Sequence, residues 1–138
     1  MNILLVDDDA DNRACMGDFL RDLGHQVTAC ENGFEAIERF REMPSDVVLT
    51  DLTMPGMNGY ELAASLRGLF PAVSVEIVVF TGGAVIATEE MKSTAAVETC
   101  LTKPLNLDQL VQVLFGIFQR IDAASGRNDA PNPERKLQ

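Results

Sequence analysis

Residues 3–9 read Ile3-Leu4-Leu5-Val6-Asp7-Asp8-Asp9, so four consecutive apolar residues lead directly into three carboxylates. An unbroken apolar run, without the alternation of a half-exposed strand, is typical of a strand covered on both faces. A second solid apolar run occurs at Val47–Leu49, and further strand candidates lie at Gln26–Cys30, Val75–Phe80 and Val97–Leu101. The opening stretch therefore predicts a buried sheet with polar residues at the point where its strand ends.

Helical patterns separate these runs. The expected helices lie at Met16–Leu23, Phe34–Phe40, Leu62–Leu69, Ala84–Ser93 (the weakest) and Leu107–Ile121. Gly24 and Pro44 are typical helix-ending residues after the first two. Strands that alternate with helices form a parallel sheet with helices on both faces, and right-handed crossovers leave few strand orders. We therefore expect an α/β fold with a five-stranded parallel sheet in the flavodoxin-like order 2-1-3-4-5.

Composition excludes several classes of protein. The chain has 138 residues and a net charge of −10, from 11 Lys and Arg against 21 Asp and Glu, which argues against direct binding of nucleic acid or an anionic membrane. No apolar run approaches the roughly 18 residues that cross a bilayer. Three widely spaced cysteines match neither a disulfide framework nor a zinc site, so we expect a reduced, cytoplasmic domain.

The charge is unevenly distributed along the chain. Residues 122–138 carry three acids and three bases, so the whole net charge of −10 lies in residues 1–121. The last 17 residues are rich in Gly, Asn, Pro and charged side chains, and Leu137 is their one large apolar residue. We therefore expect one folded domain over residues 1–121 and a disordered tail over residues 122–138.

Reactive side chains follow four of the expected strands. Asp7 and Asp8 follow the first strand, Asp51 the third, Thr81 the fourth and Lys103 the fifth. Parallel strands end at one edge of the sheet, where the working site of such folds lies. Clustered carboxylates repel one another, and a hard cation such as Mg²⁺ relieves this repulsion. Each residue alone is explained as well by a turn or a solvated surface, so only their convergence indicates a phosphoryl-binding site with an aspartate nucleophile.

At these positions the chain resembles a known family. The stretches Ile3–Asp9, Asp46–Gly59, Val78–Gly83 and Leu101–Pro104 are similar to the motifs of response-regulator receiver domains, the CheY-like family of two-component signalling. The resemblance covers residues 2 to about 121. It fits a single-domain regulator as well as the C-terminal receiver of a hybrid sensor histidine kinase.

The resemblance implies a role for each acid. Asp51 would be the phosphoacceptor of a phosphorelay, and Asp8, Asp51 and the backbone carbonyl of Thr53 would ligate Mg²⁺ directly. Asp7 would assist through water or a second contact. The phosphoryl donor would be a phosphohistidine on a sensor histidine kinase or a histidine phosphotransfer domain, and the domain would switch a protein-interaction surface rather than turn over an external substrate.

Further roles follow from the same resemblance. Thr81 would hydrogen-bond the phosphoryl group, Lys103 would pair with its oxygens, and the Lys103–Pro104 peptide bond would be cis. Receivers commonly carry Tyr or Phe three residues before this lysine, whereas this chain has Cys100, so the aromatic relay is absent or replaced. A weak homodimer through the last helix is compatible with the sequence.

Three alternatives compete with this interpretation. A haloacid-dehalogenase-like phosphatase would place an acidic residue two positions after its nucleophile, where this chain has Thr53. A pseudo-receiver, which docks without phosphorylation, would lack some of the acids, the threonine or the lysine. A flavin carrier of the flavodoxin class would need a phosphate-binding loop after the first strand, where this chain has acids that repel phosphate.

Overall fold

The strands form one parallel sheet in the order β2-β1-β3-β4-β5, which confirms the predicted topology. The computed structural model describes residues 1–82, 97 and 99–124. Its elements are β1 (Asn2–Val6), α1 (Ala10–Asp22), β2 (Gln26–Cys30), α2 (Gly33–Glu42), β3 (Val47–Asp51), α3 (Gly59–Leu69), β4 (Glu76–Thr81), β5 (Thr99–Thr102) and α5 (Leu107–Ala124). The helix expected at residues 84–93 lies outside the described residues.

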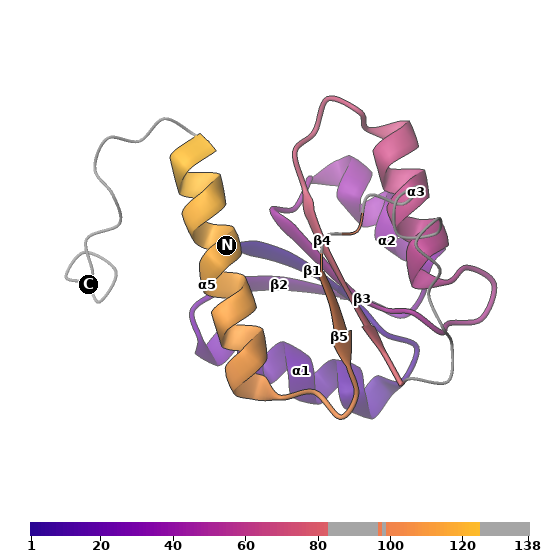
Figure 1. The fold of residues 1–138 in the computed structure, drawn as a ribbon. Helices are drawn as coiled ribbons and strands as arrows, with labels where there is room; N and C mark the ends of the chain where they lie inside the picture. Colours follow the sequence, from indigo (N-terminus) through magenta and orange to yellow (C-terminus); the bar gives the residue numbers. More distant parts are fainter. Residues whose placement is uncertain (83–96, 98, 125–138) are drawn as a thin grey trace. The chain divides into compact units, whose positions relative to one another are not determined.

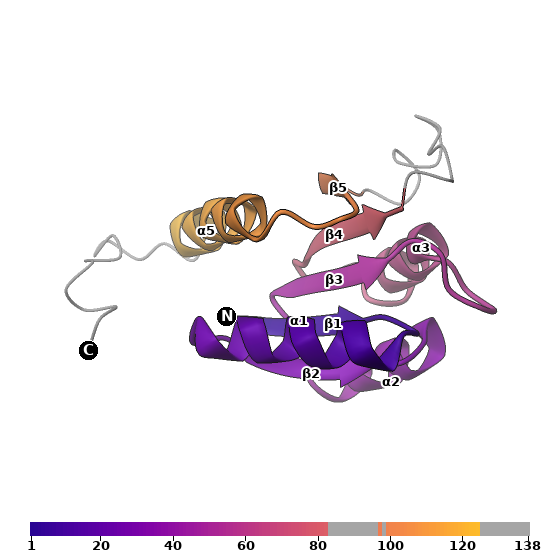
Figure 2. The ribbon, with the colours of Figure 1, turned by 90° about the horizontal axis from the view of Figure 1, so that it is seen from below.

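Helices cover both faces of the sheet. Figure 1 shows α1 on one side of the strands and α2 with α3 on the other, and in Figure 2, seen from below, α1 lies in front of the strands. Every residue of β3 is buried, and the four apolar residues of β1 are at most 1% exposed. Because successive side chains of a strand point to opposite faces, such continuous burial requires cover on both sides, as the solid apolar runs predicted.

A hydrophobic cluster lies between the sheet and helices α2 and α3. It combines side chains of β1, β3 and β4 with fully buried ones from the two helices, including Phe40, Leu62 and Leu66. The stripe predicted for the first helix is only partly buried, because Leu20 is enclosed while Leu23 is 44% exposed. This helix ends where Gly24 adopts a positive φ of 96°, a backbone conformation that residues other than glycine rarely adopt.

Helix α5 belongs to a separate compact unit that begins at Leu105, whereas residues 1–104 form the unit with the sheet. Leu110, Leu114 and Ile117 are buried as the apolar pattern predicted, whereas Leu107 at the start of the helix is 45% exposed. The helix continues to Ala124, so the expected tail boundary at residue 122 falls inside it. Residues 125–138 lie outside the described part of the chain, and their expected disorder stays a prediction. Among the described residues, no helix is long and apolar enough to cross a membrane.

Candidate functional site

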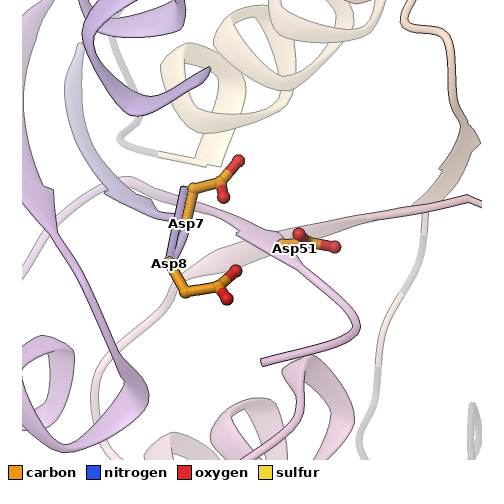
Figure 3. Close-up of side chains that lie close together, drawn as sticks. All are labelled: Asp7, Asp8 and Asp51. Carbon is orange, nitrogen blue, oxygen red and sulfur yellow. The ribbon is translucent and has the colours of Figure 1, made fainter. Parts of the chain in front are cut away.

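Three carboxylates meet at the carboxyl edge of the sheet. Asp7 and Asp8 follow β1 directly, and Asp51 is the last residue of the neighbouring strand β3. Figure 3 shows their side chains at these adjacent strand ends. One oxygen from each carboxylate lies within 4.8 Å of the others. Asp7 and Asp51 are buried, with 3% and 6% exposure, while Asp8 is exposed.

The surroundings of Asp7 disfavour its ionised form. Burial is the largest influence and raises the pKa of this carboxyl above its ordinary value. A hydrogen bond from the Asp9 amide to Oδ1 of Asp7, at 2.9 Å, acts in the opposite direction. The negative charges of Asp51 and Asp8 raise the pKa further, and the positive charge of Lys103 lowers it. Ionisation of Asp7 is therefore less favourable in the folded protein than in the unfolded chain.

Lys103 approaches the cluster from β5. Its Nζ lies 3.0 Å from Oδ2 of Asp51, 52 residues earlier in the chain. The backbone N–H of Lys103 donates to the carbonyl of Thr81 at 2.7 Å, which ties the lysine to the end of β4. The peptide bond to Pro104 is cis, as the resemblance implied. In contrast to the exposed ion pairs within helices α1 and α2, the Lys103–Asp51 pair has a buried carboxylate.

Two threonines complete the predicted set. Thr81 is the last residue of β4, one position beyond the residue that pairs with Asp51 in the sheet register. Thr53 is exposed in the loop after β3, and its backbone N–H donates to Oδ1 of Asp51 at 3.3 Å. All the residues predicted from the sequence thus come from strand ends or the loops that follow them at this edge.

The N-terminus of α3 approaches the backbone of Asp51 closely. A Cβ atom on Gly59 would lie 2.7 Å from the carbonyl oxygen of Asp51, so no larger residue fits without movement. The Gly59 amide donates to the carbonyl of Leu52 at 2.8 Å. Asn58 and Glu61 form a capping box that fixes where this helix begins. Helix α3 therefore holds the loop after Asp51 in place.

The donor set suits a small, hard cation. Magnesium prefers carboxylate and carbonyl oxygens and is held at about 2.0–2.1 Å, so two of its ligands lie about 3–4 Å apart. One oxygen from each of Asp7, Asp8 and Asp51 lies within 4.8 Å of the others, so small side-chain adjustments bring all three to one ion. Their negative charges exceed the single positive charge that Lys103 supplies to Asp51. The residues present therefore fit Mg²⁺.

The sequence did not predict two contacts at this edge of the sheet. The hydroxyl of Tyr60, at the start of α3, lies 3.1 Å from Sγ of Cys100 in β5. The partner of the cysteine at the usual aromatic position is thus a tyrosine that precedes it by 40 residues. In addition, Nη1 of Arg13 donates to the backbone carbonyl of Asp7 at 2.6 Å. No local pattern indicates the first contact, whereas a basic residue near a helix N-terminus is a weak signal of the second.

Comparison with known proteins agrees with the geometry of this edge. The family model described as response regulator receiver domain matches residues 3–115. The chain belongs to this family. Solved structures similar to this receiver domain include the chemotaxis protein CheY4 of Vibrio cholerae, with 25% identity, a TM-score of 0.77 and coverage of 84% of this chain and 97% of that one. The response regulator TrrA of Thermotoga maritima, solved with Mg(2+)-BeF, has 27% identity, a TM-score of 0.74 and the same coverages.

Curated relatives of the receiver domain are much longer proteins. The sensor histidine kinase RcsC of Salmonella typhi is 33% identical over 121 residues, which cover 88% of this chain and 13% of that protein. The virulence sensor protein BvgS of Bordetella bronchiseptica is 33% identical over 138 residues, which cover 96% of this chain and 11% of that protein. The receiver domain therefore spans about an eighth or less of the length of these relatives.

Proposed function

We propose that this receiver domain accepts a phosphoryl group on Asp51, in a Mg²⁺-dependent transfer from a phosphohistidine of a partner protein. The observation that supports it most is the surroundings of Asp51. This buried carboxylate lies 3.0 Å from the ammonium of Lys103, and its oxygens are within 4.8 Å of those of Asp7 and Asp8. A nucleophile, a cation for the incoming charge and a set of metal ligands are thus present together.

The proposed transfer is a displacement at phosphorus. A carboxylate oxygen of Asp51 forms a bond to phosphorus while the phosphorus–nitrogen bond of the phosphohistidine breaks, and the leaving imidazole takes up a proton. Lys103 would move from the Asp51 carboxylate to the phosphoryl oxygens, and the Thr81 hydroxyl would donate to one of them. Asp7, Asp8, Asp51 and the Thr53 carbonyl would hold Mg²⁺, which when bound offsets the negative charge of carboxylates and phosphoryl group.

The source of the phosphoryl group is inferred from the relatives. RcsC is a sensor histidine kinase by name, and its similarity to this chain supports a histidine kinase or a histidine phosphotransfer domain as the partner. Phosphorylation would create new charge-assisted bonds to Thr81 and Lys103 and so move the ends of β4 and β5. We assign the domain a signalling role in the cytoplasm, where its three free cysteines stay reduced.

Two other candidates receive less support. A pseudo-receiver that docks without phosphorylation has no need for the Lys103–Asp51 pair or for adjacent metal ligands, yet the chain retains both. A phosphatase that uses an aspartate nucleophile needs a carboxylic acid two residues later, and Thr53 supplies none.

Mass spectrometry of the intact chain tests the proposal. With Mg²⁺ and acetyl phosphate, the wild type should gain one phosphoryl group, and Asp51→Asn should gain none. Asp46→Asn is the matched control, because Asp46 lies just before β3 at its other end, where it accepts a hydrogen bond from the Asn2 amide. This control should be phosphorylated like the wild type. A wild type that gains no mass and binds neither Mg²⁺ nor beryllofluoride would support the pseudo-receiver instead.

A further inference from the structure

Arg13 holds the peptide group that joins the first two acids of the site. Its Nη1 donates to the carbonyl oxygen of Asp7 at 2.6 Å. The amide of Asp7 is held separately, because it donates to the carbonyl of Cys30 at the end of β2, at 3.1 Å. The carboxylate of Asp7 in turn accepts from the amide of Asp9 at 2.9 Å. The backbone of Asp7 is therefore restrained on both sides, and Arg13 supplies the restraint on the side of Asp8.

Helix stability does not account for an arginine at this position. Arg13 lies four residues after Asp9, the N-cap residue whose carboxylate accepts from the Asp11 and Asn12 amides. The N-terminal end of a helix carries a partial positive charge, so it favours acidic residues such as Asp11 and disfavours cations. A cation here costs helix stability, and the hydrogen bond to the Asp7 carbonyl is the interaction that offsets this cost.

This hydrogen bond reaches both carboxylates through the geometry of the peptide. A peptide group is planar, so fixing its oxygen sets the rotation of the plane between Asp7 and Asp8. That rotation determines the ψ angle of Asp7 and the φ angle of Asp8, and hence the direction in which the exposed Asp8 side chain leaves the backbone. Metal sites lose affinity when such outer contacts are removed, because their ligands must then be ordered by the ion.

We propose that Arg13 is a positioning residue for Mg²⁺, which orients Asp7 and Asp8 through the carbonyl group between them. The inference rests on the proposed function, since it concerns the affinity of the same acidic site for the metal. It makes a prediction opposite in sign to simple electrostatics. Removing a positive charge beside an acidic site should strengthen cation binding, whereas loss of the restraint should weaken it.

Isothermal titration of the full chain with Mg²⁺ tests this inference. Arg13→Met keeps much of the side chain's length and removes the donors, and its Mg²⁺ affinity should fall about 10-fold, the lower end of the effect of such outer contacts. Arg13→Lys, which retains a charged donor, should recover part of the loss. Arg21→Met is the matched control, because Arg21 lies on the same helix and donates to the carbonyl of Val27 at 3.3 Å, at the helix end remote from the acids. This control should bind Mg²⁺ like the wild type.

Two further measurements separate positioning from a loss of folding. The melting temperature of each variant in EDTA shows whether it is folded, and Arg13→Gln replaces the methionine variant if that one is not. The phosphorylation rate as a function of Mg²⁺ should show a raised half-saturating concentration for Arg13→Met, with a maximal rate within about twofold of the wild type because Asp51 and Lys103 are unchanged.

The outcomes are distinct. Equal or tighter Mg²⁺ binding by folded Arg13→Met or Arg13→Gln overturns the inference, as does an equal loss in Arg21→Met or a lysine variant as weak as the methionine variant. If the wild type itself neither binds Mg²⁺ nor becomes phosphorylated, the proposed function fails, whatever the variants of Arg13 do.

Discussion

Replacing Asp7 by asparagine should stabilise the metal-free protein. Asp7 is 3% exposed, and burial together with the charges of Asp51 and Asp8 raises its pKa. The ionised form of this group is therefore destabilised in the folded protein. Asparagine has the same shape and retains an oxygen that accepts the hydrogen bond from the Asp9 amide. The substitution removes the charge and leaves the packing and this contact in place.

The spacing of the carboxylates sets the charge-repulsion part of the effect, to which the relief of burying a charge adds. Two unit charges at the observed limit of 4.8 Å repel by about 3.5 kcal/mol at an effective dielectric constant of about 20, and by about 0.9 kcal/mol in bulk water. Asp8 is exposed and Lys103 neutralises much of the charge on Asp51, so the relief lies toward the lower figure. We expect about 1–2 kcal/mol, which is a rise in Tm of roughly 3–8 °C for a domain of this size.

The dependence on pH has a definite sign. Because the pKa of Asp7 is raised in the folded state, the folded protein retains this proton at a pH where the unfolded chain has lost it. The contribution of Asp7 to wild-type stability therefore declines as the pH rises from about 3.9, the ordinary value for Asp, through the folded pKa. The advantage of Asp7→Asn should be absent at lower pH, grow through this window and stay constant above it.

Thermal unfolding followed by circular dichroism in EDTA measures the difference. Asp18→Asn is the matched control for net charge, because Asp18 is 80% exposed and lies 3.8 Å from Arg21. Its Tm should stay close to that of the wild type, as is usual for exposed ion pairs. An Asp7→Asn variant no more stable than the wild type at neutral pH would refute the reasoning. In saturating Mg²⁺ the advantage should shrink or reverse, because the wild type then gains binding energy.

Other substitutions test the packing around the site. Gly59→Ala should lower the free energy of unfolding, measured by urea denaturation, by about 1–3 kcal/mol, because its Cβ would lie 2.7 Å from the Asp51 carbonyl oxygen. Gly68→Ala is the control in the same helix. Its Cβ would have no atom within 4 Å, so it should raise the free energy of unfolding by about 0.5–1 kcal/mol. Tyr60→Phe should cost about 0.5–1.5 kcal/mol, and the cost should be smaller in a Cys100→Ala background, where the 3.1 Å contact is already lost. Iodoacetamide should modify the two exposed cysteines of the folded protein and spare Cys30, because burial raises the pKa of its thiol to about 12; mass spectrometry counts the adducts, and rapid labelling of Cys30 would contradict its burial.

Much of the fold was predictable because its determinants are local. The apolar run Ile3–Val6 indicated a strand covered on both faces, and the sheet buries it so. The cap of the first helix is local as well, since Asp9 accepts from the amides of Asp11 and Asn12. The alternation of strands and helices, with the handedness of their connections, limits the strand order to a few possibilities, and the observed order is the one expected. The stripe of the first helix was less well predicted, since Leu23 has the required spacing yet is 44% exposed.

The sequence also predicted that five reactive side chains lie at one edge, because parallel strands end on the same side of the sheet. These are Asp7, Asp8, Asp51, Thr81 and Lys103. By itself the sequence determined which residues lie at this edge. Only the tertiary structure decided how they interact there: the burial of Asp7 and the 3.0 Å approach of Lys103 to Asp51.

Only the tertiary structure likewise decided two further contacts, that of Tyr60 with Cys100 and that of Arg13 with the Asp7 carbonyl. Periodicity and spacing report which face or end of an element a residue occupies. Distances, burial and hydrogen-bond partners depend on how elements remote in the chain pack together, and no local pattern contains that information.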